Sequence, residues 1–146
     1  MRRSRSKREQ CFSYKEKKRV FLSFASEDLD HVRGLRLLKD NPDFELEFYD
    51  ESIKEPIDSR NADYIKRVMD EQISRASVAV CLISETTHQS KWVDWELEKC
   101  DEEEKTIIAM AIKGVERATL PTLIKEKKLT FWTWDPEHLA KLINEA

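Results

Sequence analysis

Val78–Ile83, with the sequence VAVCLI, is a run of six apolar residues without a polar interruption. A second run of the same kind, Ile107–Ile112 (IIAMAI), occurs later in the chain. Strands that are apolar on both faces are typical of the centre of a parallel sheet, where helices cover each side. The two runs therefore predict an α/β fold in which they form the central strands.

The rest of the chain alternates strands with helices around these two runs. Residues 44–48 (FELEF) alternate strictly between apolar and charged side chains, which indicates a half-exposed strand at the edge of the sheet. Residues 114–128 are the least regular segment and suit either a short helix or a loop. The other predicted strands are 19–24 and 129–134, and the predicted helices are 29–41, 62–76, 90–104 and 136–145.

Alternation of this kind requires a parallel sheet with right-handed crossovers between its strands. With the strands numbered in chain order, the edge character of the second strand favours the order 2-1-3-4-5. The prediction is an α/β, flavodoxin-like three-layer sandwich with a five-stranded parallel sheet. In such a sheet, ligands bind beyond the carboxyl ends of the strands, here between the first and the third.

Length and charge indicate how the chain is divided. It has 146 residues, of which 40% are hydrophobic, and this fits one compact domain. Residues 1–19 contain nine Lys or Arg and two Glu, a net charge of +7; since the whole chain carries −3, residues 20–146 carry −10. We predict a basic, flexible N-terminal arm over residues 1–17 and a single domain over 18–146. The acidic body argues against nucleic acid as the main ligand.

Several classes of protein are excluded by what the sequence lacks. No apolar stretch reaches the roughly 18 residues that a membrane span needs. The three cysteines are an odd number without CxxC spacing, which indicates a reducing cytoplasm, and the three histidines are isolated, so no metal site is predicted. With two glycines in the chain, neither a GxGxxG motif nor a P-loop can form.

Polar residues follow each of the first three predicted strands. The carboxyl ends of parallel strands share one edge of the sheet, so these polar clusters are expected to meet there. Ser26 is also placed to cap the helix that follows the first strand. The clusters are Ser26-Glu27-Asp28, Asp50-Glu51-Ser52 and Ser84-Glu85.

Ser90–Leu97 (SKWVDWEL) predicts the first turns of the helix that follows Val78–Ile83. At ~100° per residue, an apolar stripe that includes Leu97 faces the core, and Glu96 lies to one side of it with Trp92 one turn earlier. A carboxylate and an indole at the border between core and solvent suit the wall of a cleft. The alternative interpretation is an ordinary surface pair of Glu96 with Lys99 at i,i+3.

Three segments in this order resemble the TIR domain family. Residues 20–28 (VFLSFASED) are similar to its opening box, residues 48–50 (FYD) and the loop after them to its second strand and BB loop, and residues 90–97 to its S-x-W-x-x-x-E-L box. The resemblance covers about residues 18–135. It is strongest to the TIR-like proteins of Thoeris-type bacterial antiphage defence.

The resemblance implies an activity and a site. In TIR enzymes the Glu four residues after the motif Trp is the catalytic carboxylate of an NAD glycohydrolase or cyclase, and it corresponds to Glu96. Trp92 matches the Trp that lines the same pocket. The implied substrate is NAD+, with no separate cofactor. The other candidate substrate-binding residues are Phe24, Ser26, Asp50 and Ser84.

The implied biology is a cytoplasmic enzyme that makes a nucleotide signal, either ADP-ribose or a cyclic ADP-ribose isomer. Its expected partners are NAD+, a phage-derived trigger, a separate effector reached through the diffusible nucleotide, and further TIR domains through self-association. The alternative hypothesis is a TIR module that serves only protein–protein association, without catalysis.

Overall fold

The computed structural model describes residues 18–39, 48–50 and 62–146 of the chain. The predicted arm (1–17) and most of the loop that resembles the BB loop lie outside the described residues, so the division into arm and domain stays a prediction. The described elements are β1 (Lys18–Ser23), η1 (Ser26–Asp28), α1 (Leu29–Lys39), β2 (Phe48–Asp50), α2 (Ala62–Arg75), β3 (Val78–Ile83), η3 (Thr87–Gln89), α3 (Lys91–Glu102), β4 (Thr106–Ala111), α4 (Thr122–Glu126), β5 (Phe131–Trp132) and α5 (Pro136–Glu145).

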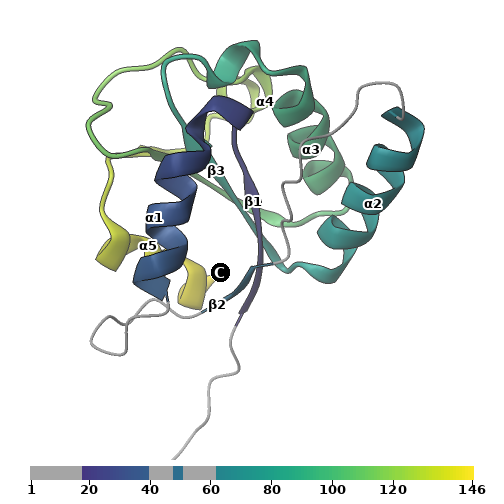
Figure 1. Cartoon of the computed structure of the whole chain (residues 1–146), viewed down its shortest axis with the longest axis horizontal. Coiled ribbons are helices and arrows are strands. Elements are labelled where there is room, and N and C mark those ends of the chain that lie inside the picture. Colours follow the sequence, from purple (N-terminus) through teal and green to yellow (C-terminus); the bar gives the residue numbers. More distant parts are fainter. Residues whose placement is uncertain (1–17, 40–47, 51–61) are drawn as a thin grey trace, which may run out of the picture.

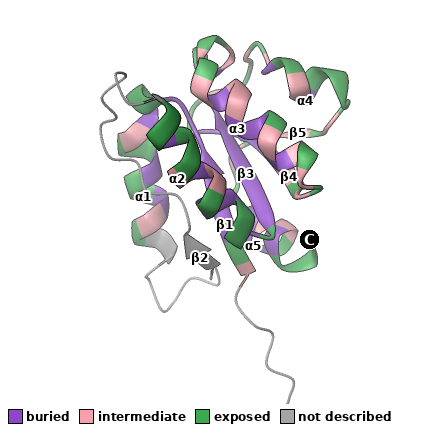
Figure 2. Ribbon diagram, turned by 90° about the vertical axis from the view of Figure 1, so that its right-hand side faces the viewer, coloured by how far each residue is buried: buried purple, intermediate pink, exposed green. Residues whose placement is uncertain are grey.

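These strands form one parallel sheet in the order β2-β1-β3-β4-β5. Helices cover both of its faces, with α1 and α5 on one side and α2, α3 and α4 on the other (Figure 1). All six residues of β3 are buried, and the helices beside the sheet are buried on their inner sides and exposed on their outer sides (Figure 2). The predicted α/β class with a parallel sheet is confirmed.

Two strands differ from their predicted limits by more than one residue. Residues 44–47 of the predicted second strand lie outside the described residues, and the described strand β2 begins at Phe48 and pairs with β1. β5 is shorter than the predicted 129–134, and it starts later because the backbone N–H of Leu129 donates to the carbonyl of Ile124 at 3.1 Å instead of pairing with β4. Leu129 therefore closes helix α4 rather than opening a strand.

Both α3 and α4 end in the same kind of C-terminal turn. After α3, Lys105 N–H donates to the Cys100 carbonyl at 2.9 Å, and after α4, Leu129 N–H donates to Ile124. This pattern is a Schellman motif, which needs a residue in the left-handed region just before the final donor. Glu104 (φ 59°) and Lys128 (φ 55°) occupy that position. Neither is glycine, so both turns carry a backbone penalty.

Replacing Glu104 or Lys128 by Gly is expected to raise the free energy of unfolding. Glycine adopts positive φ without the Cβ clash, and although it also loses more chain entropy on folding, a net gain of about 0.5–1 kcal/mol per site is expected. Urea denaturation of each variant measures this change. Gly at the exposed helical position Glu98 is the control and should lower stability by about 1 kcal/mol. Lower stability of both turn variants would contradict the argument.

Candidate functional site

Strand β1 directs alternate side chains to opposite faces of the sheet, as a strand must. Val20, Leu22 and the following Phe24 belong to the core cluster that contains residues of α1 and α5. Phe21 lies in a cluster with residues of α2 and α3 on the other face. Ser23, the last residue of β1, follows the alternation of Phe21 and reaches toward α3.

The side chains of Ser23 and Glu96 meet between β1 and α3. Ser23 Oγ donates a hydrogen bond of 2.7 Å to Glu96 Oε1, and both residues are 0% exposed. The prediction that Glu96 lies at the border between core and solvent is therefore wrong. Helix α3 contacts β1 as well as β4, so the flank that carries Glu96 is covered by β1.

The alternative of a surface pair between Glu96 and Lys99 is also wrong, because Glu96 has no exposed surface. Lys99 Nζ instead lies 3.6 Å from Asp70 Oδ1 on α2 and 3.9 Å from Glu102 Oε1. The apolar stripe of α3 is buried as predicted, with Leu97 completely enclosed. A carboxylate thus lies inside the interface between helix and sheet, where a charge needs hydrogen-bond donors.

Trp92 lies one turn before Glu96 on α3 and is half-buried. Its ring packs edge to face against Trp95, with ring centroids 6.3 Å apart and an interplanar angle of 82°. Lys66 Nζ of α2 lies 6.0 Å from the Trp95 ring centroid, a cation–π contact. The two indoles therefore pack together on the first turns of α3, and Trp95 contacts α2.

A second buried polar group joins the loops that follow β1 and β3. Ser84 Oγ donates a hydrogen bond of 2.6 Å to Asp28 Oδ2, and Asp28 is 6% exposed. The Ser84 backbone N–H donates to Thr87 Oγ1 at 2.7 Å. Nearer the surface, Thr86 Oγ1 donates to Glu27 Oε2 at 2.9 Å. The polar residues after the first and third strands thus meet at the carboxyl edge, as the sequence predicts.

The remaining candidate residues occupy different environments. Phe24 is buried in the cluster that faces α1 and α5, on the side of the sheet opposite Glu96. Ser26 is exposed and is the first residue of η1, whose N-cap position belongs to Ala25, so the predicted cap at Ser26 is wrong. Asp50 is the last residue of β2 and pairs with Val20, and its side chain lies outside the described residues.

Three polar residues of this edge were not singled out as site residues from the sequence, namely Ser23, Asp28 and Thr87. Strand alternation alone places Ser23 on the face opposite Phe24, but it does not indicate which helix covers that face. In the sequence, Asp28 and Thr87 look like ordinary loop residues. Their common hydrogen-bond partner, Ser84, is distant from Asp28 in the chain, so the sequence does not show that the three side chains meet.

Two residues within α3, Asp94 and Cys100, have shifted pKa values. Burial raises the pKa of the Asp94 carboxyl in the first turn of α3, and His88 acts in the opposite direction. His88 Nδ1 is, within the described residues, a buried nitrogen without a hydrogen-bond partner. Burial, reinforced by the charges of Glu96 and Glu103, raises the pKa of the Cys100 thiol to about 12.

The raised pKa of the Cys100 thiol predicts how the free energy of unfolding depends on pH in the alkaline range. The pKa of Cys100 is 9.0 ordinarily and about 12 in the folded protein, so the unfolded chain loses this proton first as the pH rises. The contribution of the thiol to stability is complete below pH 9 and is lost toward pH 12, at up to about 1.4 kcal/mol per pH unit. Urea unfolding of the parent and of Cys100→Ala between pH 7 and 11 tests this. The stability difference between them should narrow above pH 9, and a constant difference would contradict the assignment.

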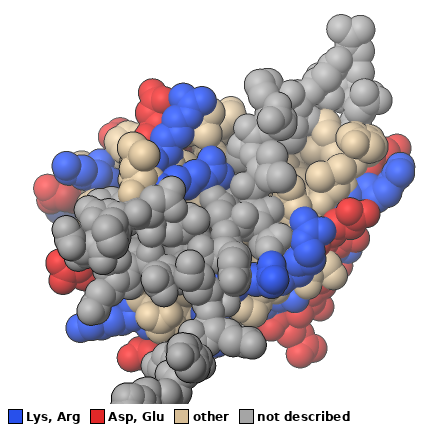
Figure 3. All heavy atoms as spheres, turned by 60° about the horizontal axis from the view of Figure 1, so that its bottom comes forward, with Lys and Arg blue, Asp and Glu red and all other residues tan. Residues whose placement is uncertain are grey.

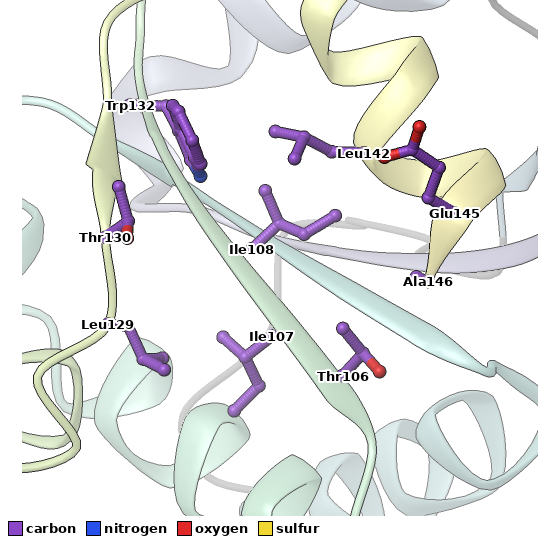
Figure 4. Close-up of a pocket in the computed structure, with 9 residues that line it drawn as sticks. All are labelled: Thr106, Ile107, Ile108, Leu129, Thr130, Trp132, Leu142, Glu145 and Ala146. Atoms are coloured by element: carbon purple, nitrogen blue, oxygen red, sulfur yellow. The ribbon is translucent and has the colours of Figure 1, made fainter.

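A separate cavity of about 320 Å³ lies between β4, β5 and the end of α5 (Figure 4). Ile107 and Ile108 line it from the start of β4, Trp132 from β5, and Leu142 from α5. The strands are parallel, so the start of β4 lies at the opposite end of the sheet from Ser23. This cavity is not part of the carboxyl edge.

Basic and acidic residues are intermixed on the face seen in Figure 3. Within residues 18–39, 48–50 and 62–146, no three His, Cys, Asp or Glu side chains lie close enough together to hold a metal ion. None of the helices described in those ranges has the length and apolarity to cross a bilayer.

The parallel sheet, its order and the polar carboxyl edge define an α/β protein of the kind that binds ligands at a switch point between strands. Comparison with known families identifies which kind. Residues 21–117 match the family of the Thoeris protein ThsB, TIR-like domain, and the chain belongs to this family. The match includes the second half of β1 (residues 21–23), the polar residues after β1 and β3, and all of α3.

Solved structures agree with the fold. The CMP N-glycosidase BcmB of Clostridium botulinum is similar over 88% of this chain and 100% of its own, with a TM-score of 0.55 and 14% identity. No curated protein matches the sequence. The structural similarity supports the fold, and the family match supports the TIR-like assignment.

Proposed function

We propose that this protein is a TIR-type NAD-consuming enzyme in which Glu96 is the catalytic carboxylate. The observation that carries the proposal is the position of Glu96: a buried carboxylate, hydrogen-bonded to Ser23 at the carboxyl end of β1, in a chain of the ThsB TIR-like family. Burying a carboxylate costs stability, so a role in chemistry is a reason for a fold to hold one there.

The chemistry needs one anion. Cleavage of the bond between the nicotinamide nitrogen and C1 of the ribose passes through an oxocarbenium-like state. A carboxylate that faces this developing positive charge lowers the barrier, and more so in a site from which water is excluded. Nicotinamide leaves as a neutral ring. Capture of the cation by water gives ADP-ribose, and capture by another group of the same nucleotide gives a cyclic isomer.

The similarity to BcmB supports this class of reaction. That protein is named as an N-glycosidase of CMP, and it shares the fold of this chain. The fold is therefore compatible with cleavage of the bond between a ribose and a nitrogenous ring. For this chain we propose NAD+ as the substrate, Trp92 as a wall of the pocket, and Phe24, Ser26, Asp50 and Ser84 as further substrate-binding residues.

The surroundings of each of these residues indicate how well it is placed to contact the substrate. The Ser84 hydroxyl donates a hydrogen bond to Asp28, so in the described arrangement it links the loops that follow β1 and β3. Phe24 is packed on the opposite face from Glu96, and substrate contact would require it to move. Trp92 is half-buried on the same helix as Glu96 and is the strongest of the set.

The enclosed position of Glu96 favours a resting state. A ribose can reach Glu96 only after the structure around it opens, since the residue has no exposed surface. We propose that a phage-derived trigger, with or without self-association of TIR domains, supplies this opening. The product then acts as a diffusible signal on a separate effector.

The test is incubation of the purified full chain with NAD+, with and without lysate of phage-infected cells, while nicotinamide release is followed. Mass spectrometry of the products separates ADP-ribose from cyclic isomers. A parallel reaction with CMP, followed by cytosine release, tests the substrate of the structural relative. NAD+ left intact in the presence of lysate, or equal consumption by Glu96→Gln, would contradict the proposal and favour the non-catalytic association module.

A further inference from the structure

The hydrogen bond between Ser23 and Glu96 joins two residues that are 73 positions apart and belong to different layers of the fold. Ser23 is a buried hydroxyl at the end of a strand whose other buried residues, Val20, Phe21 and Leu22, are apolar. A buried hydroxyl without a partner costs free energy, so its presence needs a reason. The partner that it meets is the proposed catalytic carboxylate.

We propose that Ser23 is a positioning residue, whose hydroxyl holds the Glu96 carboxylate in the orientation that the proposed reaction requires. This inference rests on the proposed function. A Glu side chain has several rotatable bonds, and a donor at 2.7 Å from Oε1 restricts them. Orientation matters because a displacement of about 1 Å at the reacting atoms can cost about 100-fold in rate.

The hydrogen bond also favours the charged form of the carboxyl, since a hydroxyl donates to an anion more strongly than to the neutral acid. Two thiols lie on the same side of the sheet: Cys81 on β3, which is paired in register with Ser23, and Cys100 on α3. The pKa of Cys100 is about 12, so this thiol stays neutral through the range in which a carboxyl titrates. On α2, the buried residue Gln72 is uncharged.

The experiment compares Ser23→Ala, which removes the hydroxyl, with Ser23→Thr, which keeps it, in the full chain. Ser77→Ala is the control, because Ser77 is exposed and its hydroxyl donates a long hydrogen bond of 3.4 Å to the Arg19 carbonyl, away from Glu96. Under conditions where the parent cleaves NAD+, Ser23→Ala should lower kcat about 10- to 100-fold and change KM less than about threefold. Ser23→Thr should recover most of kcat, and Ser77→Ala should match the parent.

A second measurement is independent of activity. The pH titration of the Glu96 side-chain carboxyl, followed by carbon NMR, should have a midpoint about one pH unit higher in Ser23→Ala than in the parent. Ser23→Cys keeps the approximate size of the side chain and has only a weak donor, so its titration midpoint should be intermediate. This variant replaces Ser23→Ala in the measurement if the alanine variant does not fold.

The outcomes separate the two proposals. If the parent cleaves NAD+ in a Glu96-dependent way and Ser23→Ala keeps the parental kcat and titration midpoint, the positioning role is overturned and the proposed function stands. If the parent shows no Glu96-dependent cleavage, the proposed function fails. An unchanged titration midpoint in Ser23→Ala overturns the inference whatever the activity.

Discussion

Replacing Glu96 by Gln is expected to lower the rate of NAD+ cleavage by at least about 1,000-fold. The amide keeps the size of the side chain but removes the negative charge that would face the ribose cation. Because Glu96 is 0% exposed, Gln is a better test than Ala, which would leave a cavity and an unpaired Ser23 hydroxyl. Nicotinamide release under triggering conditions measures the effect.

Glu98→Gln is the matched control for this prediction. Glu98 lies on the same helix, two residues further on, and is exposed, so the same chemical change there should leave the cleavage rate unaltered. Circular dichroism and a thermal scan show whether each variant is folded. Parental activity in Glu96→Gln, or equal losses in both variants, would mean that Glu96 is not the catalytic carboxylate.

Replacing Leu97 by Ala is expected to lower the free energy of unfolding by about 3 kcal/mol. Leu97 is completely buried on α3, where it packs with residues of β3, β4 and α4. Removal of its branched end leaves a cavity that the neighbouring elements cannot fill without moving. For a chain of this size, the melting temperature should fall by roughly 6–12 °C.

Leu37→Ala is the control for Leu97→Ala. Leu37 lies on α1 and is 73% exposed, so the same substitution removes little buried surface and should change stability by less than about 0.5 kcal/mol. Urea denaturation of both variants measures the difference. A loss below about 1 kcal/mol in Leu97→Ala would show that α3 is not firmly packed on the sheet.

Most of the fold could be predicted from side-chain periodicity. β3 and β4 follow from apolar runs without interruption, and α3 follows from the stripe that contains Leu97. The start of β5 could not be predicted, because the Schellman turn at Lys128 takes the N–H of Leu129 away from the sheet. The pattern of side chains does not show whether a backbone N–H donates to a carbonyl of the neighbouring strand or to a carbonyl of the preceding helix.

The candidate site was harder to predict than the fold. The motif around Trp92 and Glu96 indicated Glu96 as the candidate residue. The period of a helix, however, fixes only the angle around the helix axis at which a side chain leaves it. Whether that angle faces solvent or a neighbouring strand depends on where α3 crosses the sheet. Because α3 also lies against β1, Glu96 is enclosed and Ser23 becomes its partner. Ser26 and Phe24 were inferred from resemblance and lie in an exposed turn and in the opposite core.

The enclosed carboxylate has a mechanical consequence for activation. A charge held away from water raises the energy of the closed arrangement. If the proposed trigger separated α3 from β1, entering water would hydrate this charge and lower the energy of the open arrangement. The energy that an activating partner would have to supply to open the structure would be smaller by that hydration energy. Under this proposal, the burial of Glu96 favours the open form even before any nucleotide binds.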